Sequence, residues 1–420
     1  MIRLLRLAFA SLAFAAALAM PGTASSRDWD WHGPGGSHRI EHVFVITLEN
    51  EGYDVTFGAA SKAPYLSQTL KAKGALLTQY FGTGHFSLDN YIAMISGQAA
   101  TNETRADCQT YADFQLSGMT ADGQAIGIGC VYPRTIKTLP DQMRAAGKTW
   151  RAYMEDMGAD PSREASTCGH PVLNAADNTQ NAEAPNAKAP RGDQYASRHN
   201  PFVYFHSIID SADCEANVVN LDRLSHDIAF EATTPNFVFI TPNLCNDGHD
   251  APCVNGQPGG LVSADQFLQK WVPIIMASPA YQRGGLLVIN FDEGGIGSIT
   301  KNASGGYVIS TPGESCCSEQ PGPNLGSFPQ TIKIGSYTLT NQAFGGDRSG
   351  ALLLSPFIKP GSVSNTPFNH YSLLKTVEDI FGLDYLGYAA QPGLVGFFGC
   401  VSSDIAVNTE DQFSTCKQRR

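Results

Sequence analysis

Short apolar runs rich in β-branched residues recur along the chain, and three of them stop abruptly at polar side chains. These three runs fit buried strands of a parallel sheet and cover residues 42–48, 237–241 and 286–291. The polar residues that follow them are Glu49-Asn50, then Asn243, Asp247 and His249, then Asp292-Glu293. We therefore expect three strand ends that carry carboxylate, amide and imidazole groups.

Segments with the apolar spacing of helices alternate with these strands. They cover residues 63–73, 88–96, 135–146, 218–229, 263–278 and 370–383. Such alternation predicts βαβ units, and hence an α/β fold with a mostly parallel central sheet and helices on both faces. Ligands of such sheets bind outside the carboxyl ends of the strands, where the three polar groups are expected.

Long stretches rich in Gly, Asn and Ser separate the regular segments, at residues 98–133, 156–200 and 297–346. Loops of this length in a compact domain usually form lids or small accessory structures. We find no Pro-rich or Ser-rich linker that would divide the chain. The expectation is one domain over residues 26–420, with cap-like insertions that disulfides pin in place.

The N-terminal segment has the pattern of a secretory signal. Arg3 and Arg6 precede an apolar stretch at residues 7–20, and small residues follow around Ala24. We expect residues 1–25 to be a signal peptide and the protein to be periplasmic or secreted. An uncleaved anchor is the alternative, although the stretch is short for a membrane span. No transmembrane segment is expected after signal removal.

Charge and cysteine content narrow the class of partner. The formal net charge of −11 includes Arg3 and Arg6, and the rest of the chain has no basic stripe, which argues against a nucleic acid partner. Ten cysteines suit an oxidising compartment. A zinc cluster is the alternative use, but the chain has no C-x2-C pair. We expect a staple between Cys245 and Cys253, a pairing of Cys108 with Cys130, and different partners for Cys316 and Cys317.

The segment after residue 81 carries a candidate nucleophile. A Gly-rich turn runs into a helix whose first turn holds Ser87, beside unpaired backbone N–H groups and the positive end of the helix dipole. Anions bind readily at such a place. The alternative is that Ser87 or Asp89 only caps the helix.

Ordered motifs along the chain resemble one family. They are Glu49-Asn50 with Thr56-Phe57-Gly58, His85-x-Ser87-x-x-Asn90-Tyr91-Ile92-Ala93 with Ser96-Gly97, Asn246-Asp247-Gly248-His249-Asp250, Asp292-Glu293, and the helix at residues 370–379. In this order the chain resembles the phosphoesterase family of bacterial phospholipases C and secreted acid phosphatases, from about residue 41 to 384. The acid phosphatase branch is the more similar, since Ser87 stands at the nucleophile position and Asn-Tyr-Ile-Ala continues the helix.

The resemblance implies an alkaline-phosphatase-like fold and an exported, metal-dependent phosphoric ester hydrolase. Ser87 would be the nucleophile and would form a phosphoserine intermediate. One divalent metal ion would be held by Glu49, Asn50, Asp292 and Glu293. Such an oxygen-rich set favours Ca or Mg over Zn.

Further roles follow from residue chemistry. His249 is the candidate general acid and base, because histidine titrates near neutral pH. Asn90 lies at i+3 from Ser87, on the same helix face, and is expected to donate to the phosphate. His85, Asp247 and His370 are expected as further groups on the phosphate side.

The substrate itself stays open between a small phosphate ester and a phospholipid head group. Related sequences usually carry Pro where this chain has Asp89, whose charge near the phosphate would disfavour a dianionic monoester. A phospholipase C-type phosphodiesterase therefore remains an alternative, as does an exported binding protein without catalysis. A serine esterase is not expected, since no Gly-x-Ser-x-Gly motif occurs.

Overall fold

The computed structural model describes residues 31–33, 36–38, 40–303 and 305–398. Its centre is an eight-stranded sheet in the order β17-β4-β16-β11-β3-β10-β8-β9. In that order the strands are Ser362–Ser364, Ala75–Leu77, Ala351–Leu354, Gly285–Phe291, His42–Leu48, Phe237–Thr241, Trp150–Met154 and Val218–Asn220. Strands β11, β3, β10, β8 and β9 run parallel, whereas β16 is antiparallel to β11. The predicted mostly parallel α/β sheet is confirmed.

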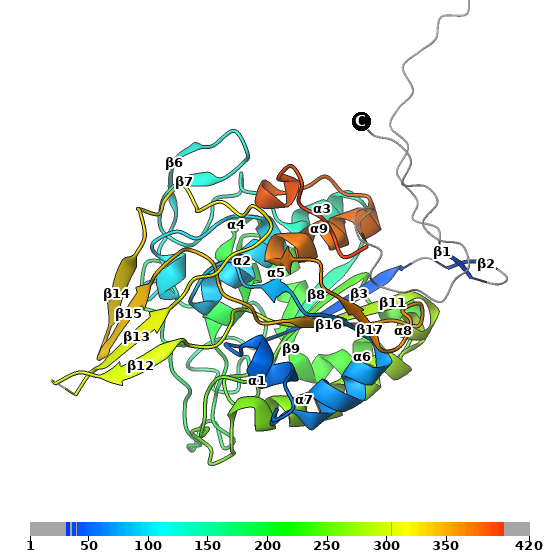
Figure 1. Cartoon of the computed structure of the whole chain (residues 1–420), viewed down its shortest axis with the longest axis horizontal. Helices are drawn as coiled ribbons and strands as arrows, with labels where there is room; N and C mark the ends of the chain where they lie inside the picture. Colours follow the sequence, from blue (N-terminus) through cyan, green and yellow to red (C-terminus); the bar gives the residue numbers. More distant parts are fainter. Residues whose placement is uncertain (1–30, 34–35, 39, 304, 399–420) are drawn as a thin grey trace, which may run out of the picture.

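Helices cover both faces of this sheet, as Figure 1 shows. On one face lie α2 (Ser87–Ser96), α3 (Leu139–Ala145) and α9 (His370–Phe381), with the short α4 (His206–Ile209) and α5 (Ala212–Asn217). On the other lie α1 (Tyr53–Phe57), a π-helix (Tyr65–Leu70), α6 (Leu224–Asp227), α7 (Gly260–Ala277) and α8 (Pro279–Gly284). Two hydrophobic cores result, because alternate residues of a strand face opposite ways. Val43 and Val45 of β3 join the first core, and Phe44 and Ile46 join the second.

The parallel registers bring the predicted strand ends together. In the central sheet β3 lies between β11 and β10, and Leu48 pairs with Phe291 while Ile46 pairs with Ile240. The residues after these strands therefore meet at one edge of the sheet. This is the arrangement that the sequence predicted for the ligand site.

One predicted helix is wrong. Residues 218–220 form strand β9, which pairs with β8 through Val218 and Ala152, and only residues 224–227 of that segment are α-helical. Two adjacent valines that are fully buried suit a strand inside the sheet better than the exposed face of a helix.

The three predicted insertions have structure of their own. The first holds the hairpin of β6 (Gln115–Met119) and β7 (Ala125–Ile128), and the second is mostly turns ending in a short helix at Ser197–His199. The third forms a separate four-stranded sheet, which projects at the left of Figure 1 in yellow. In the order β12-β13-β15-β14 its strands are Ser298–Lys301, Tyr307–Thr311, Tyr337–Asn341 and Gln330–Ile334. Two-stranded pairs complete the fold: β1 (Trp31–Gly33) with β2 (Gly36–His38), and β5 (Tyr80–Phe81) with β18 (Phe368–Asn369).

Four disulfides join cysteines of the described residues. The pairings Cys245–Cys253 and Cys108–Cys130 are confirmed. The expectation of separate partners for Cys316 and Cys317 is wrong, because these neighbours bond to each other. The pairing of Cys168 with Cys214, which links the second insertion to α5, was not predicted. The predicted signal peptide at residues 1–25 lies outside the described residues, as do Cys400 and Cys416.

Candidate active site

The nucleophile candidate Ser87 lies against the end of strand β3. Its hydroxyl donates to Glu49 Oε2 at 2.6 Å, and the hydroxyl of Tyr91, one turn along α2, donates to Glu49 Oε1 at 2.6 Å. Glu49 is fully buried. Burial, followed by the charges of Asp292 and Asp247, raises the pKa of Glu49 well above its usual range. Ser87 is therefore held by a carboxyl group with an unusually strong affinity for a proton.

A second side chain, His199, reaches Ser87 from the end of the second insertion. Its Nε2 lies 3.1 Å from Ser87 Oγ and 3.4 Å from Glu49 Oε2, and its ring stacks on Tyr91 with centroids 5.4 Å apart. Burial, and then the charge of Arg198, lowers the pKa of His199 well below its ordinary value. The ring is thus a neutral imidazole in contact with the nucleophile.

The turn before Ser87 is held together by Asn90. Its Oδ1 accepts from the backbone N–H of Thr83 at 2.7 Å and of Gly84 at 3.1 Å, and its Nδ2 donates to the carbonyls of Gly84 and Phe86 at 2.9 Å each. Asn90 has an exposed fraction of 0%. Both amide atoms are paired with backbone groups, so Asn90 positions the turn before Ser87, and its contact with phosphate stays a prediction.

Asp89 packs under the same turn. Its exposed fraction is 2%, and a Cβ added to Gly84 would meet Asp89 Oδ2 at 2.2 Å, so a side chain at residue 84 would require Asp89 to move. Burial, and then the charge of Glu293, raises the pKa of Asp89 well above its usual range. The expected repulsion between Asp89 and phosphate loses its main ground, because a carboxyl group with so high a pKa favours the neutral form.

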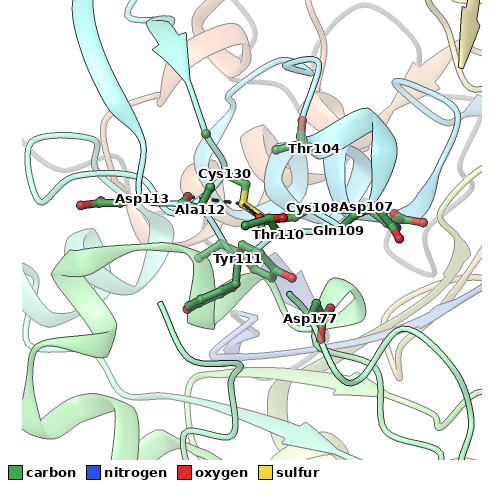
Figure 2. Close-up of a disulfide and its surroundings, with 12 residues drawn as sticks. Thr104, Asp107, Cys108, Gln109, Thr110, Tyr111, Ala112, Asp113, Cys130 and Asp177 are labelled. Atoms are coloured by element: carbon green, nitrogen blue, oxygen red, sulfur yellow. Dashed lines mark hydrogen bonds between the residues drawn. A yellow bond between two sulfur atoms is a disulfide. The ribbon is translucent and has the colours of Figure 1, made fainter. Parts of the chain in front are cut away.

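The start of helix α2 is capped by a carboxylate from elsewhere in the chain. Asp107 Oδ1 accepts from the backbone N–H of Leu88 at 3.0 Å, at the helix end where an anion was expected. Figure 2 shows Asp107 next to Cys108, whose disulfide with Cys130 fixes this stretch. Burial raises the pKa of Asp107 to about 6, although the nearby Arg198 guanidinium opposes the shift. The chain therefore supplies its own anion to the helix dipole.

Asp292, at the end of β11, places a second buried carboxyl group near Glu49. We call these carboxyl groups at the ends of β3 and β11 the acidic wall. Asp292 Oδ1 accepts from the backbone N–H of Asn50 at 2.9 Å, and the Asn50 amide donates to Glu293. Burial, and then the charge of Glu293, raises the pKa of Asp292 to about 8. The four residues predicted to hold a metal thus lie together, and contacts join them across the β3 and β11 ends.

His85 lies between two carboxylates. Its Nδ1 contacts Glu293 Oε2, and its Nε2 lies 2.9 Å from Asp347 Oδ2. Burial disfavours the charged ring, but the charge of Glu293 and the hydrogen bonds to Asp347 and Glu293 outweigh it and raise the pKa of His85 to about 10. His85 lines the cleft as an imidazolium, which suits its expected place near phosphate.

His370 and His249 lie in different surroundings. His370 is fully buried beneath the strand end, with Nδ1 at 2.8 Å from the Tyr80 hydroxyl and Nε2 at the backbone carbonyl of Asp292. It supports the backbone of Asp292, and its expected place on the phosphate side stays a prediction. His249 lines the cleft with its side chain 42% exposed, and its backbone N–H donates to Asp247 Oδ1 at 2.9 Å. Asp247 is buried, with its Oδ2 at 3.9 Å from His199 Nδ1.

The donors at these strand ends fit a hard divalent cation in their chemistry. Asp247 Oδ2 and Asp292 Oδ2 are buried and have no hydrogen-bond partner among the described residues. A buried carboxylate oxygen without a partner is costly, and a bound cation would relieve that cost. Within the same described ranges, however, no group of three or more His, Cys, Asp or Glu side chains already surrounds one point as ligands. Glu49 and Glu293 instead bond to Ser87, Tyr91, Asn50 and His85.

Sequence reasoning missed Arg198, His199 and Asp107. All three come from insertions where no apolar strand precedes them, so the pattern that marked Glu49 and Asp292 is missing there. Arg198 lines the cleft, with Nε at 3.7 Å from Asp107 Oδ2. The adjacent Arg198 and His199 within a polar stretch were the one available signal.

Comparison with known proteins gives a consistent set of relatives. The family model described as Phosphoesterase family matches residues 60–384. A probable acid phosphatase of Kluyveromyces lactis is 25% identical over 258 residues, which is 60% of this chain and 48% of that protein. A phosphatidylinositol-3-phosphatase of Mycobacterium tuberculosis is 21% identical over 85% of this chain and 83% of that protein. The chain spans about half the length of the acid phosphatases it matches. Among solved structures, an alkaline phosphatase superfamily protein from Vibrio parahaemolyticus aligns with 86% of this chain and 73% of its own, at 11% identity and a TM-score of 0.45.

Proposed function

Since the chain belongs to the Phosphoesterase family, we propose that it hydrolyses phosphoric esters with Ser87 as the nucleophile. The observation that carries this proposal is the position of Ser87 Oγ, which lies 2.6 Å from Glu49 Oε2 and 3.1 Å from His199 Nε2 in a residue that lines a cleft. A serine hydroxyl is a weak nucleophile at its free pKa and needs such neighbours to lose its proton.

In the first step Ser87 Oγ attacks phosphorus and the bond to the leaving alcohol breaks. The hydroxyl proton passes to the pair formed by Glu49 and His199, which contact Oγ from two sides. Arg198 and protonated His85 line the same cleft and would stabilise negative charge on the phosphoryl oxygens. His249 stays our candidate for the acid that protonates the leaving oxygen and for the base that later activates water against the phosphoserine.

Metal dependence is part of the proposal. Glu49, Asn50, Asp292 and Glu293 would hold one divalent cation, with Ca or Mg favoured over Zn by the oxygen donors. When bound, such an ion lowers the pKa of a coordinated hydroxyl and draws charge from a phosphoryl oxygen. Asp247, whose Oδ2 has no hydrogen-bond partner among the described residues, lies beside this group, and its charge helps to raise the pKa of Glu49.

Export is also proposed. Four disulfides among the described residues suit an oxidising compartment, and the N-terminal pattern suits a cleaved signal. None of the helices that the structure describes is long and apolar enough to cross a membrane.

The decisive experiment compares Ser87→Ala with Ser96→Ala, a matched change on the same helix. The buried Ser96 hydroxyl donates to the carbonyl of Ile92 and accepts from the N–H of Gln98. Both variants and the parent are assayed with p-nitrophenyl phosphate, bis(p-nitrophenyl) phosphate and phosphatidylcholine vesicles, each with and without EDTA. We expect Ser87→Ala alone to abolish turnover, and acid-quenched parent to carry a phosphoryl group on the peptide containing Ser87.

Each contrary result has a separate meaning. If Ser87→Ala still turns over substrate, Ser87 is not the nucleophile. If EDTA leaves the rate unchanged with every ester, hydrolysis does not depend on a metal. A parent that hydrolyses none of the esters supports the binding-protein alternative. The ratio of monoester to diester rates decides between the phosphatase and phospholipase C types.

A further inference from the structure

The third insertion contributes one face of its sheet to the active-site cleft. The cleft has a volume of about 790 Å³ and runs without a break from Ser87 and His85 to side chains of β12, β13, β14 and β15. One end of the cleft is lined by acidic and basic groups, and these take part in the proposed hydrolysis at Ser87. Its other end is apolar and has no role in that reaction.

Strand register explains the apolar end. Ile299 pairs with Ile309, Ile309 with Leu339, and Leu339 with Ile332, so four aliphatic side chains form one row across the sheet. Two residues along the strands on the same face, Tyr307 pairs with Tyr337. Their rings stack with centroids 5.5 Å apart. All six side chains line the cleft.

The opposite face of the same sheet has a different character. The neighbouring rows contain Thr300, Val308, Thr338 and Lys333, and then Ser298, Ser310, Thr340 and Thr331. The sheet is therefore amphipathic, with its apolar side toward the cleft and its polar side away from it.

This apolar face is accessible. Ile299 is 56% exposed, Tyr337 50% and Tyr307 37%. An exposed apolar face beside polar groups commonly marks a binding site, and ligand pockets combine apolar walls with a few directed polar groups. Because face and nucleophile share one cleft, an occupant of the face can be joined by a single ester bond to a phosphoryl group at Ser87.

We propose that the apolar face of the β12–β15 sheet binds the alcohol portion of the substrate, and that the preferred substrates are phosphate esters of apolar alcohols which enter the cleft as single molecules. The proposal rests on the proposed hydrolysis at Ser87 and names its substrate class. The aliphatic row would hold an alkyl chain, and the Tyr307–Tyr337 pair would close the far end of the platform.

The test is a series of substrates with alkyl groups of different length, measured on the full-length protein with Ca²⁺ and Mg²⁺ present. Glycerol phosphate, butyl phosphate and octyl phosphate are compared as substrates below their micelle concentrations. We expect kcat/KM to rise about tenfold to hundredfold from butyl to octyl phosphate, through KM, because each fully buried methylene gives up to about fourfold. Methylphosphonate and octylphosphonate binding by calorimetry provides a readout that needs no turnover.

Two variants locate the effect. Ile299→Thr places a polar group on the apolar face and should lower the octyl-to-butyl ratio about threefold to tenfold, as expected for a partly exposed side chain. Val308→Thr makes the same kind of change on the opposite face of the adjacent strand and should leave the ratio unchanged. Equal effects of the two variants would show that the ratio reports sheet stability and would overturn the proposal.

The remaining outcomes separate this proposal from the proposed function. Hydrolysis of glycerol phosphate with no dependence on alkyl chain length would overturn the proposed role of the apolar face but not the proposed hydrolysis at Ser87. Phosphonate binding that depends on alkyl chain length, without turnover of any ester, would support the role of the apolar face and overturn the proposed hydrolysis. Turnover of phosphatidic acid in vesicles, with no gain for octyl over butyl phosphate in solution, would make the face a membrane contact and also overturn the proposal.

Discussion

The carboxyl group of Asp292 should make the stability of the protein depend on pH when no divalent cation is bound. Burial and the charge of Glu293 raise its pKa to about 8 from an ordinary value of 3.8. Between these values the folded chain binds a proton that the unfolded chain releases. The contribution of this carboxyl group to the free energy of unfolding is therefore fully present below about pH 4. It is lost as the pH rises toward 8, by up to about 1.4 kcal/mol per pH unit.

A bound cation should remove this dependence, because it stabilises the ionised carboxylate that pH 8 produces. At a cation concentration one hundred times the dissociation constant, the added stability is about 2.7 kcal/mol. The assay is urea unfolding from pH 5 to pH 8 in EDTA, in Ca²⁺ and in Mg²⁺. From pH 5 to pH 8 in EDTA we expect Asp292 to cost at most about 4 kcal/mol of the free energy of unfolding.

Asp292→Asn is the matched variant. It keeps an oxygen for the N–H groups of Asn50 and Glu293, which donate to Oδ1 at 2.9 and 2.7 Å, but removes the charge. It should flatten the slope in EDTA and abolish the cation response. The reasoning is refuted if parent and variant have the same slope in EDTA, and the metal assignment is refuted if cations stabilise both equally or neither.

Three further predictions follow from other contacts. His199→Asn should lower kcat about 10²-fold to 10⁴-fold with a smaller effect on KM, because the ring contacts the Ser87 hydroxyl at 3.1 Å, and an unchanged kcat in steady-state assays would exclude it as a proton carrier. Asp107→Ala should cost about 1–2 kcal/mol in urea unfolding by removing the oxygen that caps the Leu88 N–H, whereas Asp113→Ala, in the same stretch in Figure 2, should cost less than half of that. Glu378→Gln should flatten the fall in stability between about pH 4.5 and 9, since burial raises the pKa of Glu378 to about 9, and unlike Asp292→Asn it should keep the response to cations.

The fold and the acidic wall could be predicted because both depend on local pattern. Runs of β-branched residues predicted β3, β10 and β11, and the rule that ligands meet at the carboxyl ends of parallel strands then predicted that Glu49 and Asp292 lie together. The structure has Asn50 N–H at 2.9 Å from Asp292 Oδ1, across 242 positions of sequence. The turn before Ser87 could also be predicted, because its glycines are visible in the sequence. In the structure the missing Cβ of Gly84 leaves room for Asp89.

The rest of the site could not be predicted because it depends on the path of irregular segments. His199 reaches Ser87 through an insertion whose course is set by turns, by Arg163 contacts to backbone carbonyls, and by the Cys168–Cys214 disulfide. Nothing in the local sequence states where such a segment ends in space. His249, in contrast, followed a recognisable strand and was predicted as the general acid and base; it lines the cleft, whereas His199, which was missed, contacts Ser87 Oγ.

The strand ends alone make an incomplete site, and this explains why the insertions carry so much of the chemistry. After burial, the charges of Asp292 and Asp247 raise the pKa of Glu49, and those of Asp250 and Asp292 raise the pKa of Asp247, so in their ionised forms these carboxylates would repel a phosphate. Positive charge in the cleft comes from Arg198 and from protonated His85, and any cation held by the carboxylates would add to it. The third insertion supplies the apolar face, whose period-2 pattern was present in the sequence but was masked by the Gly, Ser and Asn around it. An amphipathic sheet that keeps its apolar side accessible costs stability unless something covers it, so its position beside Ser87 is best explained by a ligand that binds both.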